Sequence, residues 1–420
     1  MEAEVTLESV LEADNLRHAW KAVKANAGAA GVDGRDIEHT QKHLKAHWAG
    51  IADKLKVGQY RPGAIREVHI PKANGGTRVL GIPNVQDRLI QQAILQQLTP
   101  IFDPDMSNHS YGFRPGRSAH DAMDAARRFV AAGKTWVVDI DLKNFFDQIN
   151  HDKLMHAVAH RVRDKSLLRL IGDYLRAPMQ EVDGRHRARP KGTPQGGPLS
   201  PLLANIYLHP LDEALAKRGV AFVRYADDIA IFAASERAAK RILEGVTKWI
   251  EKELKIEVNR DKSGTGRSHD TQLLGFRIHR EGDVSVAPKA LERLKEKVRE
   301  IWNARRLQTE DDLKERWRSV IQGWWNYFSY TNWRREVTDL SGWIRRHMRK
   351  YFWQRWHSPK GRANALGKLG VRGRAVRVAS SSRGAWPMAR HVVVQQALKT
   401  ATLKRWGFGL PWELASKPRG

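Results

Sequence analysis

Phe222-Val-Arg-Tyr-Ala-Asp-Asp-Ile-Ala-Ile-Phe232 is the stretch of sequence that decides the fold. Apolar residues lie on both sides of the three-residue break Ala226-Asp227-Asp228, which predicts two short strands joined by a tight turn. Two adjacent carboxylates at the tip of such a hairpin repel each other and are costly to desolvate, and a bound cation is the usual compensation. An ordinary solvated turn is the alternative, and the pair alone does not exclude it.

The composition indicates a folded and strongly basic chain. The 420 residues are 41% hydrophobic, which is enough for two to four domains, and their formal net charge is +27. No run approaches the ~18 apolar residues of a membrane span, and the N-terminus lacks a secretory signal. The absence of cysteine excludes disulfides and thiolate zinc sites. We expect a cytoplasmic protein with no membrane partner.

Positive charge is concentrated in the last third of the chain. Residues 287–420 contain 30 Lys and Arg against 10 Asp and Glu, and no acidic residue occurs between Leu340 and Trp412. A folded segment that tolerates such self-repulsion usually faces a polyanion. The same segment holds 11 of the 15 tryptophans, and aromatic rings beside cations suit nucleic acid, on whose bases and sugars they stack. A nucleic-acid partner is therefore expected.

Residues 65–82 alternate between apolar and polar positions on both sides of a glycine-containing turn, which predicts a β-hairpin. Lys72 and Arg78 flank that turn on opposite strands. Two cations on a protruding ribbon can hold a triphosphate, although isolated cations in such places are more often solvated. The following residues, from Pro83 to Thr99, have the spacing of a helix, which Pro100 is expected to end.

A second acidic strand is predicted at Trp136-Val-Val-Asp-Ile-Asp-Leu142. Asp139 and Asp141 share one face of this strand because side chains alternate along it. Carboxylates in an apolar strand are costly to bury, so we expect at least one of the two to have a cationic partner.

Two loops lead into helices. The loop 110–118 carries Arg114 and Arg117, which are candidates for phosphate or template contacts. The Gly/Pro-rich loop that begins at Lys191 can bring its backbone close to a ligand and feeds a helix. A separate short helix is predicted at Leu211–Arg218, just before the acidic hairpin.

The order of these elements predicts an α+β fold. Strand, helix, loop and helix, acidic hairpin, helix and two further strands at 254–262 and 272–278 describe an antiparallel sheet backed by helices. From Pro288 onward, helices are predicted at 288–305, 309–330 and 333–357, with aromatic residues at core spacing. A compact basic tail, 361–420, follows.

A carboxylate strand, a Gly/Pro loop and an acidic hairpin occur in this order in right-hand polymerases, whose chemistry uses two divalent ions about 3.5–4 Å apart. Mg²⁺ requires hard oxygen ligands such as these carboxylates. The chain resembles group II intron-encoded reverse transcriptases (maturases), most closely the compact bacterial class C type. The blocks similar to that family's occur in order from about residue 8 to residue 412: Gly31-Val-Asp-Gly34, Ile70-Pro-Lys72, Arg78-Val-Leu-Gly-Ile-Pro83, Ser110–Ser118, Asp141-Leu-Lys-Asn-Phe-Phe-Asp147, Thr193-Pro-Gln-Gly-Gly-Pro198, Tyr225-Ala-Asp-Asp228, Leu254–Lys262, Leu274-Gly-Phe276 and Gly323-Trp-Trp-Asn-Tyr-Phe328.

The resemblance implies a set of catalytic residues. Asp141, Asp227 and Asp228 become the ligands of two Mg²⁺ ions, and the Leu142 carbonyl completes the shell of one ion. Asp139 is expected to have a structural role.

The resemblance also implies substrate contacts. Lys72 and Arg78 hold the triphosphate, with Lys262 approaching the phosphates; Phe146 blocks a ribose 2′-OH, and Gln195 lines the nucleotide pocket. Arg345 and Arg346, in the helical region, join Arg114 and Arg117 as candidate contacts to template or intron RNA.

The implied architecture is a right-hand polymerase. Residues 1–285 form fingers and palm, with an N-terminal extension over about 1–60, residues 286–360 a helical thumb (domain X), and residues 361–420 a small basic DNA-binding domain. Larger members end in an endonuclease domain with cysteines or a histidine-rich metal site. With no cysteine and His391 as the last histidine, we expect that domain to be absent and priming to use an existing 3′ end.

The implied function is RNA-directed DNA polymerisation. The partners are dNTPs, an RNA template with its DNA primer, the intron RNA whose splicing the protein assists, and a target DNA for intron mobility. A bacterial location near the nucleoid follows. Two alternatives stay open: a non-catalytic RNA-splicing chaperone, which clustered carboxylates disfavour because they repel phosphate, and a related reverse transcriptase taken over by its host for defence or repair.

Overall fold

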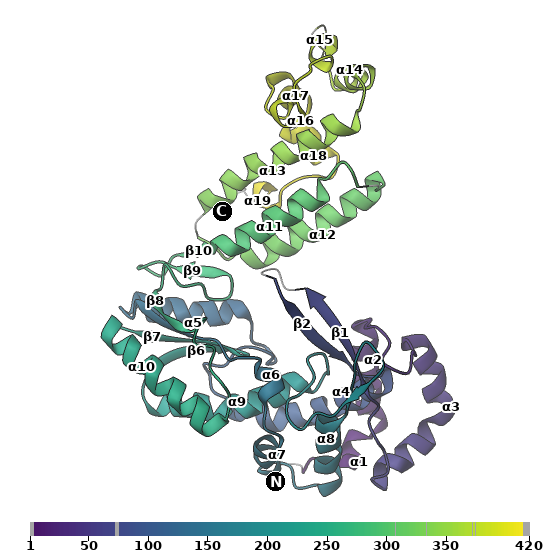
Figure 1. Cartoon of the computed structure of the whole chain (residues 1–420), viewed down its shortest axis with the longest axis vertical. Coiled ribbons are helices and arrows are strands. Elements are labelled where there is room, and N and C mark those ends of the chain that lie inside the picture. The colour runs from purple at the N-terminus through teal and green to yellow at the C-terminus, as the bar shows by residue number, and fades with distance from the viewer. Residues whose placement is uncertain are drawn as a thin grey trace. The chain divides into compact units, whose positions relative to one another are not determined.

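The computed structural model describes residues 4–71, 75–306, 308–332, 334–371, 373 and 375–414. The chain divides into two compact units, Met1–Arg267 and Ser268–Gly420 (Figure 1). The α+β class is confirmed, because the first unit combines antiparallel strands with helices packed against them. Within the described residues, no helix is both long enough and apolar enough to cross a membrane.

Helices make up most of the first unit. They are α1 (Leu7–Val10), α2 (Ala13–Ala25), α3 (Ile37–Lys56), α4 (Val85–Phe102), the short 3-10 helix η1 (Asp103–Asp105), α5 (Ala119–Ala131), α6 (Phe145–Gln148), α7 (His151–Ala159), α8 (Lys165–Arg176), α9 (Ser200–Lys217), α10 (Glu236–Trp249) and the π-helical turn η2 (Ile250–Leu254).

The acidic hairpin forms one half of a four-stranded sheet with the order β6-β7-β3-β8, in which β7 is central and β6 lies at the edge. Its strands are β6 (Ala221–Tyr225), β7 (Asp228–Ala233), β3 (Trp136–Ile140) and β8 (Gly264–Arg267), and each pair is antiparallel. Tyr225 pairs with Asp228, so the predicted turn is confirmed and consists of Ala226 and Asp227 alone. The partner strand β3 runs directly beside β7, which brings the second acidic segment to the same end of the sheet.

The predicted hairpin at 65–82 is also confirmed. It consists of β1 (Ile65–Pro71) and β2 (Thr77–Ile82), and Ile70 pairs with Arg78. Two short strands, β4 (Met179–Gln180) and β5 (His186–Arg187), extend it into a sheet of order β2-β1-β4-β5, in which β1 and β4 are parallel. Lys72 lies outside the described residues.

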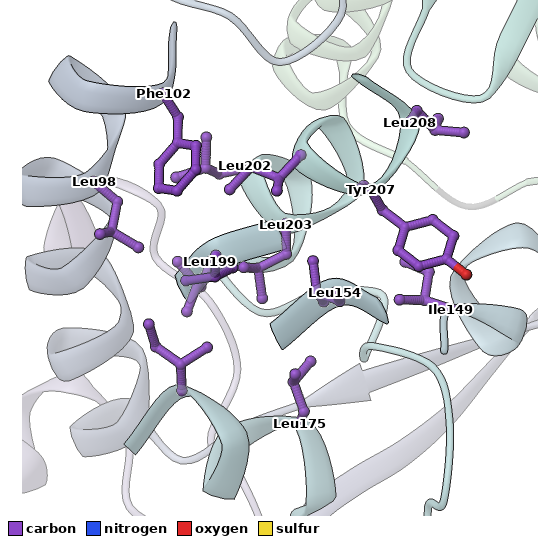
Figure 2. Packing of buried hydrophobic residues seen from close by; sticks show 14 of the residues in the cluster. Leu98, Phe102, Ile149, Leu154, Leu175, Leu199, Leu202, Leu203, Tyr207 and Leu208 are labelled. Carbon is purple, nitrogen blue, oxygen red and sulfur yellow. The ribbon is translucent and has the colours of Figure 1, made fainter. Parts of the chain in front are cut away.

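A helical core supports the sheet that contains the acidic hairpin. Leu199, directly before α9, and Leu202 and Leu203 of α9 pack among buried residues of the neighbouring helices (Figure 2). The others in view include Leu98, Phe102, Ile149, Leu154, Leu175, Tyr207 and Leu208. Because α9 is apolar on nearly every side, it is buried on nearly every side.

Two predicted helix boundaries, both beside prolines in the structure, are wrong. Pro100 lies inside α4, which continues to Phe102, and Pro210 lies inside α9, which runs unbroken where a separate short helix was predicted. An internal proline removes one backbone hydrogen bond and strains the preceding turn. In both helices the residues beyond the proline are buried, as Phe102 and Leu211 show, and this burial favours continuation.

The strand predicted at 254–262 is wrong as well. Leu254 ends η2, and the segment that follows makes only one isolated bridge, between Val258 and Leu142. Two backbone hydrogen bonds nevertheless tie it to the end of β3: Asn259 N–H donates to the Asp141 carbonyl and Lys143 N–H to the Glu257 carbonyl, each over 2.9 Å. The segment therefore supports Asp141 without forming a regular strand.

The second unit begins with a small hairpin, β9 (Phe276–Ile278) and β10 (Val284–Val286). The three predicted helices are confirmed as α11 (Pro288–Ile301), α12 (Glu310–Phe328) and α13 (Arg334–Arg355). Shorter helices follow: α14 (Pro359–Lys368), α15 (Ala375–Ala379), α16 (Ala385–Met388), α17 (Val392–Ala397), α18 (Thr400–Arg405) and α19 (Pro411–Leu414).

One core runs through the helices of this second unit. Trp302 and Trp317 are fully buried at its centre, with their ring centroids 5.4 Å apart. The Phe408 ring, from the basic tail, lies 5.0 Å from the Trp302 ring, and Leu366 and Leu403 are buried in the same cluster. Residues beyond 360 therefore share a core with the three long helices, and the predicted division at 285 and 360 stays a prediction.

Candidate active site

A cavity of about 1170 Å³ opens beside the tip of the acidic hairpin, within the first unit. Its walls come from the sheet that contains the acidic hairpin, from α6, from the Gly/Pro-rich loop and from strand β2. The site residues predicted from the sequence that line it are Arg78, Asp141, Leu142, Phe146, Gln195, Asp227, Asp228 and Lys262. Segments separated by almost two hundred residues thus supply one concave surface.

The hairpin carboxylates stand at the edge of this cavity. Asp227 lies in the two-residue turn and Asp228 opens strand β7. Asp228 reaches solvent, yet the surrounding walls raise its pKa from 3.8 to about 6, and repulsion from Asp227 and Asp141 adds to the rise. Burial likewise raises the pKa of Asp227, against the opposing charge of Arg78. Holding these like charges close together therefore costs folding free energy.

Strand β3 carries Asp139, and Asp141 directly follows its last residue. Burial and repulsion from Asp228 and Asp141 raise the pKa of Asp139 to about 6, so all these acids share one electrostatic field. Among the described residues, neither Asp139 nor Asp141 forms an ion pair with a cationic side chain. The expected cationic partner, which a metal ion would also provide, stays a prediction. The Asp141 backbone is held instead: its N–H donates to Ser263 Oγ over 2.9 Å.

The donor set fits Mg²⁺. Carboxylate oxygens are hard ligands, and an ion would relieve the repulsion that raises these pKa values. In the part of the chain that the structure describes, no three His, Cys, Asp or Glu side chains already converge on one metal position. Mg²⁺ commonly takes only one or two protein carboxylates and completes its shell with water and substrate phosphates. The cavity therefore suits ions that bind together with a nucleotide.

The loop that carries Gln195 contacts strand β2 on one side and helix α6 on the other. The Gly81 N–H of β2 donates to the Gln195 carbonyl over 2.9 Å, and a Cβ on Gly196 would lie 2.5 Å from the Gly81 carbonyl oxygen. On the other side, Thr193 N–H donates to the Phe146 carbonyl over 2.8 Å. Only glycine fits the contact at position 196, where φ is +134°. These contacts fix Gln195 relative to Phe146.

The predicted nucleotide contacts differ in how far the structure describes them. Phe146 on α6 lines the cavity and packs its ring at 5.3 Å from that of Phe145. Arg78 on β2 is exposed and lines the same cavity, where its charge acts on Asp227.

The prediction that Arg114 contacts template is wrong in the structure. Its side chain is only 3% exposed, pairs with Asp103 at 2.7 Å and donates to the carbonyls of Asp103, Ser107 and Ser110. A guanidinium whose donors are taken up by this many protein acceptors stabilises its own loop and is not available to bind RNA. Arg117 donates to Asn108 and lies over the Tyr111 ring, and its predicted RNA contact stays a prediction.

The candidate RNA contacts in the second unit are partly exposed. Arg345 pairs with Glu413, and Arg346 lies over the Trp386 ring with the guanidinium carbon 5.6 Å from the ring centroid. Both roles stay predictions.

Three residues at the site were missed from the sequence. Arg88 and Phe113 line the cavity, and Phe113 is 54% exposed with φ at +59°. Ser263 holds Asp141 from a segment more than a hundred residues away. An exposed aromatic residue in a left-handed conformation is unusual, but the sequence shows no signal of it beyond the glycine on its N-terminal side.

Two family descriptions match the chain. "Reverse transcriptase (RNA-dependent DNA polymerase)" matches residues 70–278, and "Group II intron, maturase-specific domain" matches residues 291–370. Protein YkfC of Escherichia coli is 33% identical over 315 residues, which cover 65% of this chain and 82% of YkfC. The chain belongs to the group II intron reverse transcriptases. It is thus an RNA-directed DNA polymerase of the maturase type, and reverse transcriptase domains of this kind use a divalent metal.

Other relatives match shorter parts. The group II intron-encoded protein LtrA of Lactococcus lactis is 41% identical over 175 residues, which cover 41% of this chain and 29% of LtrA. Apo telomerase from Candida Tropicalis aligns with 86% of this chain and 68% of its own at 12% identity and a TM-score of 0.46, a likeness too low to bear on function. Assignment to the class C type of group II intron reverse transcriptase stays a prediction.

Proposed function

We propose that this group II intron reverse transcriptase extends a DNA 3′ end on an RNA template by two-metal nucleotidyl transfer, with Asp141, Asp227 and Asp228 as ligands of two Mg²⁺ ions. The observation that carries the proposal is the convergence of these carboxylates from β3 and the β6–β7 turn in one cavity with Arg78, Phe146 and Gln195. Clustered carboxylates repel phosphate and would lower the RNA affinity of a protein that only binds RNA. They therefore disfavour the non-catalytic alternative.

The chain's own residues orient the reactants. Asp141, Asp227 and Asp228 would hold the ions, with the Leu142 carbonyl as a further ligand, and bound Mg²⁺ activates the 3′ oxygen and neutralises the leaving phosphates. Arg78 contributes a fork of donors for the triphosphate, together with Lys72. Gln195 bounds the nucleotide pocket. Phe146 presents a ring where a ribose 2′-OH would otherwise fit, which favours dNTPs.

The partners proposed for the second unit are nucleic acids. Residues 287–420, which make up most of it, carry a net charge of +20, and exposed cations such as Arg390 suit intron RNA and target DNA. Assistance to intron splicing and to intron mobility follows from these contacts, as does association with the nucleoid. Arg345, Arg346 and Arg117 are the proposed RNA contacts.

The experiment that tests the catalytic assignment is primer extension by Asp227→Asn on an RNA template. We expect extension to fall by roughly a thousandfold or more, because the amide keeps the shape but loses the charge that binds metal. Asp53→Asn, at an exposed position of α3, is the matched control and should extend at the wild-type rate. Wild-type extension by Asp227→Asn would overturn the metal assignment.

The intron assignment is tested separately with RNA. Purified wild type and Asp227→Asn should both raise the splicing of the RNA that flanks the gene, since splicing assistance needs binding but not polymerisation. If neither protein affects splicing while wild type extends primers, the host-recruited alternative is favoured instead.

A further inference from the structure

A buried ion pair lies behind the hairpin that carries Asp227 and Asp228. Arg224, in β6, has no exposed surface and makes a bidentate pair with Asp212 of α9, with N–O distances of 2.7 and 2.6 Å. Asp212 is equally buried. An ion pair with no access to solvent is expensive to form, so its presence calls for a reason other than stability.

All five N–H donors of Arg224 find an acceptor. Besides the two bonds to Asp212, Nη2 donates to Ser110 Oγ over 2.8 Å and Nη1 donates to Asn205 Oδ1 over 2.9 Å. The remaining Nη1–H donates to the Ala226 carbonyl, also over 2.9 Å. The guanidinium therefore connects α9 and the loop before α5 to the turn of the acidic hairpin.

That turn is in a conformation that needs support. Ala226 has φ at +57°, in the left-handed region that non-glycine residues rarely adopt. Gly112 presses on it from the same loop, because a Cβ at this glycine would lie 2.3 Å from the Ala226 nitrogen. Asn205 Nδ2 in turn donates to the Gly112 carbonyl over 2.9 Å, so one network holds both the turn and the glycine against it.

We infer that Arg224 is a positioning residue for catalysis: its bond to the Ala226 carbonyl fixes the strained turn that aims Asp227 and Asp228 into the cavity. The inference rests on the proposed role of these two aspartates as metal ligands. Arg224 itself touches neither the cavity nor the substrate site. Mg²⁺ demands near-ideal octahedral geometry. A turn that is free to relax would therefore lower the affinity for the metal more than the affinity for the nucleotide.

Lysine cannot replace arginine in this arrangement. It keeps the charge opposite Asp212, but its single ammonium cannot reach the two Asp212 oxygens, Ser110 and the Ala226 carbonyl together. Ser110→Ala is the matched control. It removes one of the buried bonds of Arg224 and leaves the bond to Ala226 in place.

The test measures metal binding without turnover. Full-length Arg224→Lys is loaded with an RNA template and a dideoxy-terminated primer, and Mn²⁺, which accepts the same oxygen ligands, is titrated with the free ion followed by electron paramagnetic resonance. We expect Mn²⁺ affinity to fall by about 10- to 100-fold, as for other residues that orient metal ligands. Ser110→Ala should bind Mn²⁺ as wild type does. In primer extension with Mg²⁺, kcat should fall for Arg224→Lys while KM for dNTP stays unchanged.

Two further variants separate failure of the positioning role from misfolding and from failure of the proposed metal site. If Arg224→Lys does not fold, the double variant Arg224→Met with Asp212→Leu removes both buried charges and decides the question by the same titration. Wild-type Mn²⁺ affinity in a folded variant of Arg224 overturns the inference. Asp227→Asn tests the function beneath it: unchanged Mn²⁺ affinity there would overturn the metal site itself, whereas a loss there with none at Arg224 would overturn only the positioning role.

Discussion

The carboxylate cavity of the first unit and the aromatic core of the second arrange charge in opposite ways. Around Asp141 and Asp228, like charges are gathered at the edge of a cavity, and desolvation together with mutual repulsion raises the pKa of Asp228 to about 6. Around Trp302 and Trp317, rings fill the interior and the cations stay near the surface. The first arrangement costs folding free energy, which the proposed metal site explains, whereas the surface charge of the second suits the proposed long-range attraction of nucleic acid.

This difference predicts where single substitutions act. In the cavity, small changes should alter chemistry with little effect on folding. In the second unit, core changes should alter folding, and surface changes should alter only affinity for nucleic acid.

The largest effect is expected from Trp317→Ala, at the centre of the second core. Trp317 is fully buried against Trp302, so its truncation should lower the free energy of unfolding by about 3–5 kcal/mol. Urea titration followed by tryptophan fluorescence measures the loss. Val392→Ala, at a valine that is 59% exposed, should change stability by less than about 0.5 kcal/mol. A small loss at Trp317 would show that the core tolerates a large cavity.

The next effect concerns sugar selection in the cavity. Phe146→Ala should let ribonucleotides be incorporated, since the ring no longer fills the space of a 2′-OH; a contact of this size is worth about 1–3 kcal/mol, or roughly 10- to 200-fold in selectivity. The measurement is the ratio of kcat/KM for a dNTP and its ribonucleotide. Phe129→Leu, at a half-buried ring of α5 that does not line the cavity, is the control and should keep the wild-type ratio. An unchanged ratio for Phe146→Ala would remove Phe146 from this role.

A pH effect separates the two units further. In the metal-free fold the pKa values of Asp139 and Asp228 are about 6, above those of the unfolded chain, so ionising them costs stability as pH rises from about 4 to about 6. Under the proposed assignment, Mg²⁺ binds the ionised form of Asp228, and its charge also favours the ionisation of nearby Asp139. The rise in melting temperature given by Mg²⁺ over EDTA should therefore grow as pH passes through about 6 and level off above about 7. Asp228→Asn should flatten this profile; a profile that is the same in both proteins would contradict the assignment.

The smallest effect is expected from the cations beside Trp386. Arg346 and Arg390 both lie over this ring, at 5.6 and 6.0 Å. Replacing both with Gln should weaken RNA binding several-fold at low salt and reduce the slope of log affinity against log salt by about 1 for each phosphate that is no longer neutralised. Filter binding at several salt concentrations measures this, with primer extension at saturating template as the control that should not change. An unchanged slope would place the RNA elsewhere.

Sequence patterns predicted the elements whose own residues determine them. The hairpins at 65–82 and 222–232 were predicted because apolar alternation and turn residues are local signals. The ends of α4 and the continuity of α9 were not, since burial of residues beyond Pro100 and Pro210 decides them. Tertiary context overrides local preference at such places.

The same limit applies to the site. Asp141, Asp227 and Asp228 stand out in sequence because acidic residues are unusual in apolar strands. Ser263 and Arg224 do not stand out, because their roles come from contacts with residues distant in sequence. Arg114 shows the opposite error: a loop arginine in a basic protein suggests RNA, but its acceptors are Asp103 and nearby carbonyls, which no spacing rule reveals.

The Phe408 ring against Trp302 has a consequence for how such proteins can be recombined. A segment whose side chains fill the core of the adjacent helices cannot be exchanged as an independent domain. Chimeras that join this basic tail to the thumb of a relative should fold only when Trp302, Phe408 and Leu403 are transplanted together. Substitutions on the two sides of residue 360 are therefore expected to evolve in compensating pairs.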